Sequence, residues 1–422
     1  MLNPTPPISG HLLDDFQLDS FGQLPFLRIY TQLSSCYACS DETSDDAIID
    51  TLTRGLERLT ASFPWLAGQV VCEGASEGHS GIFKIKPWHQ LPKLVVKHGR
   101  HDAAYPTMDA LREAQFPVGM LHESLIAPLN TIPAPSDLAD GTPVFLLQLT
   151  FIRGGLILTS LTEHQTADMT GQGHIMHLFS KACRNEPFTP DELTSGNLPR
   201  HDRIPLLENP SSYQPGPELA YQLIQPSTAA STTSPPPSAT WANFLFSAES
   251  QSALKSLATT TKTTPFISTD DALSAFIWQS ISRIRLPRLP PSSSTSTPTT
   301  FERAVDARPY LDIPATYPGL IQNMAYATNP SIHDLATRPL GEIASLLRRG
   351  VDPQTSQLGF NTRALATYLH RTADKGTVSF TATADPATDL MFSSWAKIGL
   401  QGEDFGMGVG VPEAVRRPGA SK

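Results

Sequence analysis

The sequence has few cysteines, no long apolar run and fewer basic than acidic residues. Its 422 residues include 4 cysteines, and 31 Lys and Arg against 40 Asp and Glu give a net charge of -9. This acidic balance argues against nucleic acid or an anionic membrane as the main partner. No apolar run approaches the ~18 residues that span a bilayer, and the N-terminus lacks the basic-then-apolar pattern of a signal peptide. We expect a cytoplasmic protein.

The small number of cysteines also limits redox and metal chemistry. Cys36 and Cys39 have the C-x-x-C spacing of a redox or zinc site, but Cys72 and Cys183 do not form a second pair. The residues around Cys36 are typical of a strand. We therefore predict four reduced thiols.

The chain is long enough for two or three domains and, at 40% hydrophobic residues, for a sizeable core. A stretch rich in Ser, Thr and Pro, residues 225–240, cannot bury enough apolar surface to order itself. We place the boundary between two domains in this stretch. The prediction is an N-terminal domain of residues 1–224, a crossover linker of 225–240 and a C-terminal domain of 241–422.

Apolar spacing predicts mixed strands and helices in both halves. Residues 144–152 and 156–161 form a predicted hairpin. In the second half we expect helices at 338–350 and 361–373, and strands at 241–246, 301–307, 378–383 and 390–395. Two further helices begin after the capping residues Ser44 and Ser268. Their predicted buried stripes are Ile48, Ile49, Leu52, Leu56, Leu59 and Phe63 for the first, and Leu273, Phe276, Ile277, Ile281 and Ile284 for the second.

The hairpin leads into His164-x-x-x-Asp168, followed by Gly171 and Gly173. A histidine that leaves a buried strand just before a glycine-rich bend is well placed to face a cavity, because backbone can approach a ligand closely at glycine. A neutral imidazole suits the removal of a proton from an alcohol. Alone, the motif is weak, since about one such spacing arises by chance in a chain with this many histidines.

A metal site is the rival interpretation of this region. His164, Asp168, His174 and His177 fall within 14 residues, and the last two are three apart on a predicted helix. The His-Glu-x-x-His signature of zinc hydrolases is absent. We predict no metal.

A second motif, residues 404–408 (Asp-Phe-Gly-Met-Gly), stands near the end of the chain. With His164-x-x-x-Asp168 it resembles the BAHD-type acyl-CoA acyltransferases. Longer stretches resemble the fungal trichothecene 3-O-acetyltransferases, and the resemblance runs from about residue 19 to the C-terminus. These stretches are residues 29–32, 64–70, 154–159, 180–185, 268–278, 304–309 and 393–397.

The resemblance implies an α/β (mixed α+β) two-domain fold of coenzyme A-dependent acyltransferases, with a channel between the domains. It implies a monomeric O-acetyltransferase of fungal secondary metabolism, with acetyl-CoA as co-substrate and no cofactor. The expected acceptor is the C-3 hydroxyl of a trichothecene mycotoxin. Two alternatives stay open: O- or N-acylation of another terpenoid, polyketide or alkaloid, and a truncated, inactive homologue.

The family's functional set maps onto His164, Asp168, Ser393 and Asp404. His164 is the implied general base, and transfer is direct because the thioester is already activated. Asp168 and Asp404 are implied to be structural, and Arg308 is the predicted ion-pair partner of Asp404 because it lies in the family's arginine-bearing segment.

For the tetrahedral intermediate, the resemblance implies a hydroxyl donor at Ser393, with Trp395 shaping the acceptor pocket beside Gly171 and Gly173. A hydroxyl in that position is worth a few kcal/mol. The residues leave a second interpretation open, in which Ser393 is a polar residue at the edge of a strand and Trp395 packs in the core.

For coenzyme A, we predict contacts at Ser268 and Thr269, where a helix start exposes N–H groups that suit phosphate. Lys255 and Arg283 would add positive charge. Simple capping for Ser268 and a solvated surface for the basic residues are the alternatives.

The sequence departs from the family pattern in three places. Met407 replaces a tryptophan, Met169 replaces a glycine, and the chain stops at Lys422, 14 residues after Gly408, where the family continues. Loss of the last strand and helix would leave an unpaired sheet edge and uncovered apolar surface. We expect poor solubility.

Overall fold

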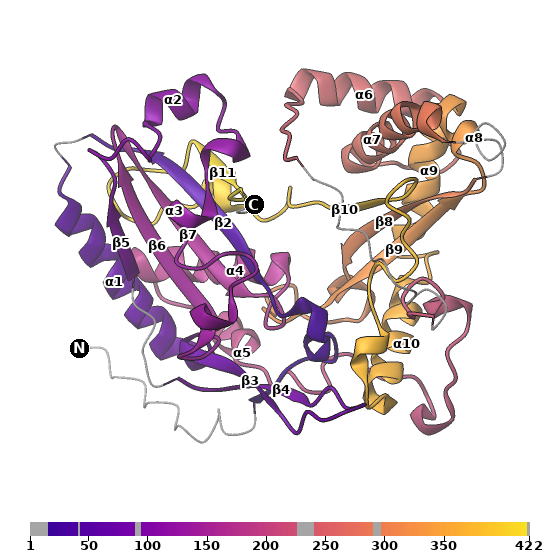
Figure 1. Ribbon diagram of the computed structural model, residues 1–422, viewed down its shortest axis with the longest axis horizontal. Coiled ribbons are helices and arrows are strands. Elements are labelled where there is room, and N and C mark those ends of the chain that lie inside the picture. The colour runs from indigo at the N-terminus through magenta and orange to yellow at the C-terminus, as the bar shows by residue number, and fades with distance from the viewer. Residues whose placement is uncertain (1–15, 41–42, 89–93, 226–239, 290–296, 420–422) are drawn as a thin grey trace.

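Two lobes lie side by side, each built on a mixed sheet with covering helices (Figure 1). The computed structural model describes residues 16–40, 43–88, 94–225, 240–289 and 297–419. Apart from its two end residues, the predicted linker of 225–240 lies outside these ranges. The arrangement confirms the predicted mixed α/β architecture.

The first lobe contains a five-stranded sheet in the order β11-β2-β7-β6-β5, with β5 parallel to β6 and the other pairs antiparallel. A smaller sheet has the order β1-β4-β3. The strands are β1 (Phe16–Gln17), β2 (Tyr30–Ala38), β3 (Gly68–Glu73), β4 (Ile82–Pro87), β5 (Leu94–His98), β6 (Phe145–Ile152), β7 (Gly155–Glu163) and β11 (Ala414–Arg416). The helices are α1 (Asp45–Ser62), α2 (Met108–Glu113), α3 (Glu123–Ile126), α4 (Met169–Cys183) and α5 (Pro190–Gly196).

The predicted hairpin of β6 and β7 is confirmed, and β7 is buried along its whole length. Side chains alternate between the two faces of a strand. Leu156 and Leu158 therefore pack in one core with α1 and α4, while Ile157 packs in another with α2. A strand covered on both faces gives the histidine that follows it a rigid support.

Helix α1 agrees with its predicted signals. The Ser44 side chain accepts from the Ala47 N–H, as an N-cap does. The apolar stripe that includes Leu52 and Leu59 is buried against α4 and the large sheet. Local sequence alone was sufficient for this element.

The second lobe holds the sheet β10-β8-β9, in which β10 is parallel and β9 antiparallel to β8. Its strands are β8 (Thr299–Asp306), β9 (Gln322–Asn329) and β10 (Leu390–Ser393), and its helices are α6 (Ala248–Thr260), α7 (Thr269–Arg285), α8 (Ile332–Thr337), α9 (Leu340–Val351) and α10 (Leu358–Arg371). Short 3₁₀ helices complete the described chain: η2 (Phe21–Gln23), η3 (Pro25–Leu27), η4 (Pro64–Ala67), η5 (Val118–Met120), η6 (Pro135–Leu138), η7 (Pro210–Ser212), η8 (Pro217–Leu219), η9 (Leu286–Arg288), η10 (Arg308–Tyr310), η11 (Lys375–Thr377) and η12 (Leu400–Gly402).

The buried face of α7 is not the one predicted. The face with Ala272, Ala275 and Trp278 is fully buried, and Trp278 packs on Phe301 of β8. The predicted stripe is only partly covered, and Ile284 is 61% exposed. Small residues let α7 approach the sheet closely, so the face with alanines and one large aromatic becomes the inner one.

Two predicted strands are absent from the described chain. Residues 241–246 belong to no helix or strand, and residues 378–383 form turns apart from one bridge between Val378 and Leu223. The alternation of apolar residues predicts a strand only where a neighbour offers free backbone groups. Within the described ranges, no strand pairs with either segment.

Near the C-terminus the chain crosses from the second lobe back to the first. Although residues 414–416 belong to the predicted second domain, β11 pairs with β2 in the first sheet (Figure 1). Among the described helices, none is long and apolar enough to cross a membrane.

Candidate functional site

His164 follows β7 directly and is held by backbone and ring contacts. Its N–H donates to the Ile29 carbonyl at 2.8 Å, and its Nδ1 lies 3.1 Å from the Ala167 carbonyl oxygen. A carbonyl can only accept, so this contact assigns the proton to Nδ1 and leaves the lone pair on Nε2. Burial lowers the pKa of His164 below its ordinary value of 6.5, so the ring is neutral at pH 7.

Asp168 is the N-cap of α4 and the partner of Arg308. Its Oδ1 accepts from the Gly171 N–H at 2.8 Å, and its Oδ2 accepts from the Ile321 N–H at 2.8 Å. Arg308 donates from Nη1 to Oδ2 at 2.9 Å and from Nη2 to Oδ1 at 3.1 Å. Both side chains are buried. This bidentate pair joins the His164 loop to the second lobe.

The predicted ion pair of Arg308 with Asp404 is therefore wrong. The Asp404 carboxylate accepts from the Gly406 N–H at 2.8 Å, and its carbonyl accepts from Arg184. Gly406 and Gly408 both have positive φ, near 66° and 76°, so this motif needs glycine at these two positions. Phe405 packs on Phe179 of α4. The motif thus shapes a turn that docks on α4, without contacting Arg308.

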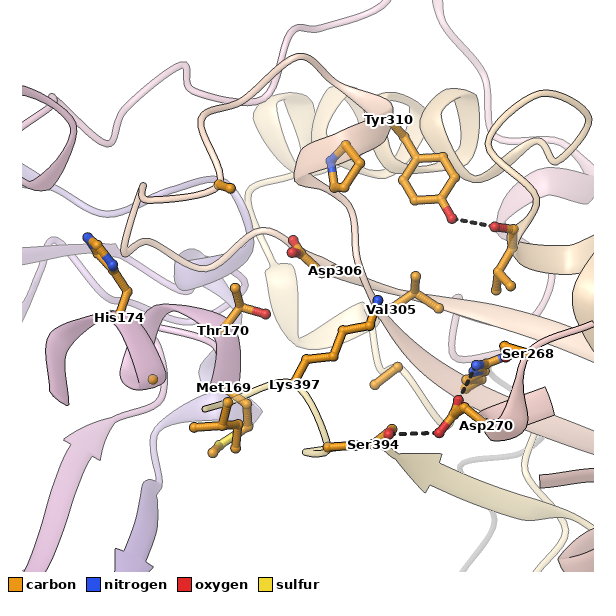
Figure 2. Close-up of a pocket in the computed structure, with 18 of the residues that line it drawn as sticks. Met169, Thr170, His174, Ser268, Asp270, Val305, Asp306, Tyr310, Ser394 and Lys397 are labelled. Carbon is orange, nitrogen blue, oxygen red and sulfur yellow. Dashed lines mark hydrogen bonds and ion pairs between the residues drawn. The ribbon is translucent and has the colours of Figure 1, made fainter. Parts of the chain in front are cut away.

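A cavity of about 680 Å³ lies between α4 and the second lobe. Figure 2 shows Met169, Thr170 and His174 of α4 on one side, with Lys397 extending from its loop into the space between the lobes. The lining residues are Met169, Thr170, Gly173, His174, His177, Ser268, Asp270, Arg303, Ala304, Val305, Asp306, Pro309, Tyr310, Ala315, Arg348, Val351, Pro353, Ser394, Ala396, Lys397, Ile398 and Glu403. His164 is not in this lining but lies five residues before Met169, at the start of the wall that α4 forms.

Of the four predicted coenzyme A contacts, only Ser268 lines the cavity. Its hydroxyl and N–H are both engaged with Asp271 in a capping box, and Thr269 is the first residue of α7. Lys255 stacks on Phe266. Arg283 donates to the Ala336 carbonyl. It lies 15 residues after Ser268, which is about 22 Å further along α7. The expected cluster of four residues does not form.

The basic groups of the cavity are residues that sequence reasoning missed. Arg303 pairs with Asp270 and Asp271, and Arg348 also pairs with Asp271. Lys397 also lines the cavity, and none of the described residues forms an ion pair with it. Its position two residues after Trp395, inside a family-like stretch, was the available signal.

Ser393 and Trp395 contact each other. The Trp395 Nε1–H donates to the Ser393 Oγ at 3.0 Å, and Trp395 packs against the core of the first lobe. Neither residue lines the cavity, whereas Ser394 does and donates to Asp270 at 2.9 Å. The oxyanion role of Ser393 stays a prediction.

The two glycines after Asp168 are required by packing between the lobes. A Cβ at Gly171 would lie 2.1 Å from the Pro318 carbonyl oxygen. At Gly173 a Cβ would lie 2.9 to 3.0 Å from Ile398 atoms. Each glycine therefore lets α4 approach the second lobe closely. Gly173 also lines the cavity whereas Gly171 does not, and the substrate contact expected of these glycines stays a prediction.

The remaining histidines of α4 do not form a metal site with their neighbours. His177 Nδ1 bonds Glu403 Oε1 at 2.7 Å, and this contact raises the pKa of His177. Burial and the nearby His177 lower the pKa of His174 to about 4. Among the described residues there is no group of three or more His, Cys, Asp or Glu that could hold a metal ion.

Known proteins with this architecture identify the family. The family model described as "Transferase family" matches residues 127–418, and the one described as "Trichothecene 3-O-acetyltransferase-like N-terminal domain" matches residues 29–183. The chain belongs to the Transferase family, and it is an acyltransferase. The resemblance deduced from the two motifs is thereby confirmed.

Curated relatives extend over nearly the whole chain. O-acetyltransferase dmxR13 of Cryptosporiopsis is 51% identical over 96% of this chain and 88% of that protein. Trichothecene 3-O-acetyltransferase TRI101 of Fusarium sporotrichioides is 49% identical over 96% and 87%. About half of the aligned residues of this acyltransferase are therefore identical to those of two proteins named as O-acetyltransferases.

Solved structures agree with the fold. TRI101 of F. graminearum complexed with coenzyme A and deoxynivalenol has a TM-score of 0.90 at 48% identity, covering 96% of this acyltransferase and 89% of that chain. Vinorine synthase, at 16% identity, shares the fold with a TM-score of 0.64. The two-domain fold expected from the sequence is confirmed.

Proposed function

We propose that this acyltransferase is an acetyl-CoA-dependent O-acetyltransferase that acts on the C-3 hydroxyl of a trichothecene, with His164 as general base. The observation that carries the proposal is the His164 ring, with Nδ1 bound to the Ala167 carbonyl and a basic Nε2. The named activities of the relatives and the ligands in their structures support the choice of acetyl donor and acceptor.

In the proposed reaction, the acceptor oxygen attacks the thioester carbonyl carbon while His164 Nε2 takes the hydroxyl proton. The tetrahedral intermediate then collapses, the C–S bond breaks, and the proton passes from His164 to the departing thiolate. The products are an acetate ester and coenzyme A. A positioned base of this kind contributes roughly 10²–10⁴-fold.

The neutral state of His164 fits this task. Burial lowers its pKa, so the ring is unprotonated at physiological pH, while the Nδ1–H contact to Ala167 stabilises the protonated form that exists during transfer. Ser393 stays our candidate for the oxyanion donor, because its Oγ accepts from Trp395 and its own O–H is still able to donate. Its side chain does not line the cavity and would have to reorient toward it.

The cavity along α4 is the proposed channel for acetyl-CoA. A phosphate in this space would find Lys397 as a point charge, since the Arg303 and Arg348 guanidinium groups are engaged by carboxylates. We further propose that the enzyme works as a cytoplasmic monomer with no cofactor.

Another acceptor alcohol is the second candidate. The 51% identical relative is named only as an O-acetyltransferase, so its name does not favour a trichothecene over another alcohol. The residues that line the acceptor side decide between the two.

Radiolabelled acetyl-CoA with deoxynivalenol, followed by location of the new ester by NMR, tests the proposal. We expect acetyl transfer to the C-3 hydroxyl, and loss of transfer in His164→Ala. Transfer only to other alcohols would replace the acceptor, and transfer that survives His164→Ala would remove the base. Absence of transfer by folded protein to a panel of fungal alcohols would favour an inactive homologue.

A further inference from the structure

We infer that Arg200 is a positioning residue that holds the His164 loop from the side opposite Arg308. The inference rests on the proposed function, because it assumes that His164 is the base. Arg200 lies in the segment after α5, outside every motif that the sequence singles out.

The chemistry of His164 depends on the direction of the Ala167 carbonyl. Only if the Ala167 carbonyl points at Nδ1 is the lone pair kept on Nε2. Gln165 anchors one end of the loop by donating to the Gly22 carbonyl at 2.8 Å, and Asp168 anchors the other through Arg308. The peptide between them needs an anchor of its own.

Arg200 supplies this anchor. Its Nη1 donates to the Thr166 carbonyl, one residue before the carbonyl that orients His164. The guanidinium lies 4.1 Å from the centre of the Trp65 ring and 3.6 Å from Asp19 Oδ2. At 2% exposure Arg200 is as deeply buried as the arginine on the other side of the loop. A stacked, paired guanidinium has little freedom to move.

Asp19 connects Arg200 with the second lobe. It accepts from the Tyr317 hydroxyl at 2.5 Å and from the Leu320 N–H at 3.1 Å. Arg308 donates to two carbonyls of the same segment, residues 317–320, which are those of Tyr317 and Gly319. Two buried arginines therefore hold one loop at neighbouring points, Arg200 at the Thr166 carbonyl and Arg308 at the Asp168 carboxylate. Both are linked to residues 317–320 of the second lobe, Arg200 through Asp19 and Arg308 directly.

Lysine cannot replace this guanidinium fully. An ammonium group could keep the charge opposite Asp19, but it lacks the planar surface that stacks on Trp65 and the fixed fork of donors. We expect Arg200→Lys to retain the fold and to lose part of the orientation of the loop.

The test compares the kinetics and the histidine tautomer of three variants. Arg200→Lys keeps the charge, and the paired variant Arg200→Met with Asp19→Asn removes both charges, so that no carboxylate is left buried alone. Arg58→Met is the matched control, because Arg58 also stacks on an aromatic ring (Phe188, 5.0 Å) and donates to a carbonyl, but at the far end of α4.

We expect kcat to fall on the order of 10²-fold in the paired variant, as small displacements of catalytic groups do. The fall should be smaller in Arg200→Lys, and the KM for acetyl-CoA should stay within threefold. The ¹⁵N spectrum should show the Nδ1-protonated form of His164 giving way to a mixture, with the signal assigned by its loss in His164→Gln. Arg58→Met should change neither.

Unchanged kcat and tautomer in folded Arg200 variants would overturn the inference. A uniform loss of activity with an intact His164 tautomer would also overturn it, since that is the effect of reduced stability alone. Wild-type protein with no acetyl transfer would instead count against the proposed function, and the tautomer measurement would still test Arg200.

Discussion

Removing the Arg308 side chain should strongly destabilise the protein, and the structure gives the magnitude. Arg308 is fully buried and bonds Asp168 twice, Asp306 once, and the Tyr317 and Gly319 carbonyls. Arg308→Ala would leave the Asp168 carboxylate buried without its cation, which typically costs about 3–5 kcal/mol. That is a large fraction of the ~5–15 kcal/mol that stabilises a folded domain.

Urea denaturation followed by tryptophan fluorescence measures this loss. With an m-value of about 3 kcal/mol/M, the midpoint should fall by roughly 1 to 1.7 M. Arg308→Lys should lose less, because it keeps the charge opposite Asp168. Acetyl transfer should fall as well, since the pair fixes the loop of His164.

A double-mutant cycle separates the observed pairing from the one predicted by the sequence. Arg308→Ala with Asp168→Ala should show a coupling of about 1–3 kcal/mol, whereas Arg308→Ala with Asp404→Ala should be additive within about 0.5 kcal/mol. A loss below about 1 kcal/mol in Arg308→Ala, or strong coupling to Asp404, would refute the assignment.

Three further predictions concern protonation and the donor site. Burial lowers the pKa of His164, and a general base acts only when it is unprotonated. The acidic limb of the profile of kcat/KM against pH should therefore have its midpoint below pH 6.5. A midpoint above pH 7 would contradict this. Lys397→Ala should raise the KM for acetyl-CoA about tenfold, because it removes a charged hydrogen bond of ~1.5 kcal/mol. Lys255→Ala should leave this KM unchanged. Equal effects of the two substitutions would exclude Lys397 as a specific contact. Glu403 raises the pKa of His177, so their contact adds stability that is complete below pH 6.5 and disappears as pH rises through the higher folded pKa. The Tm difference between wild type and Glu403→Gln should therefore shrink from pH 6 to pH 9, and a constant difference would refute the link.

Several features followed from the sequence because their causes are local. The Ser44 cap and the 3.6-residue spacing of Leu52 and Leu59 lie within a few turns of one helix, so α1 could be predicted closely. The exit of His164 from a buried strand was equally local. The family, the fold and the acyltransferase class followed from such stretches and were confirmed by the comparisons.

What the sequence could not decide was which distant groups meet. Arg308 had carboxylate candidates in both motifs, and only the docking of the lobes put it on Asp168, 140 residues away, and not on Asp404. The inner face of α7 depended on how closely β8 lies, and residues 241–246 pair with none of the strands in the described part of the chain. Arg200 carried no local signal, because its importance comes from the Thr166 carbonyl and Trp65 ring that folding brings to it. Capping and periodicity are properties of a short segment, whereas a buried charge is stabilised by whichever groups the whole fold places around it.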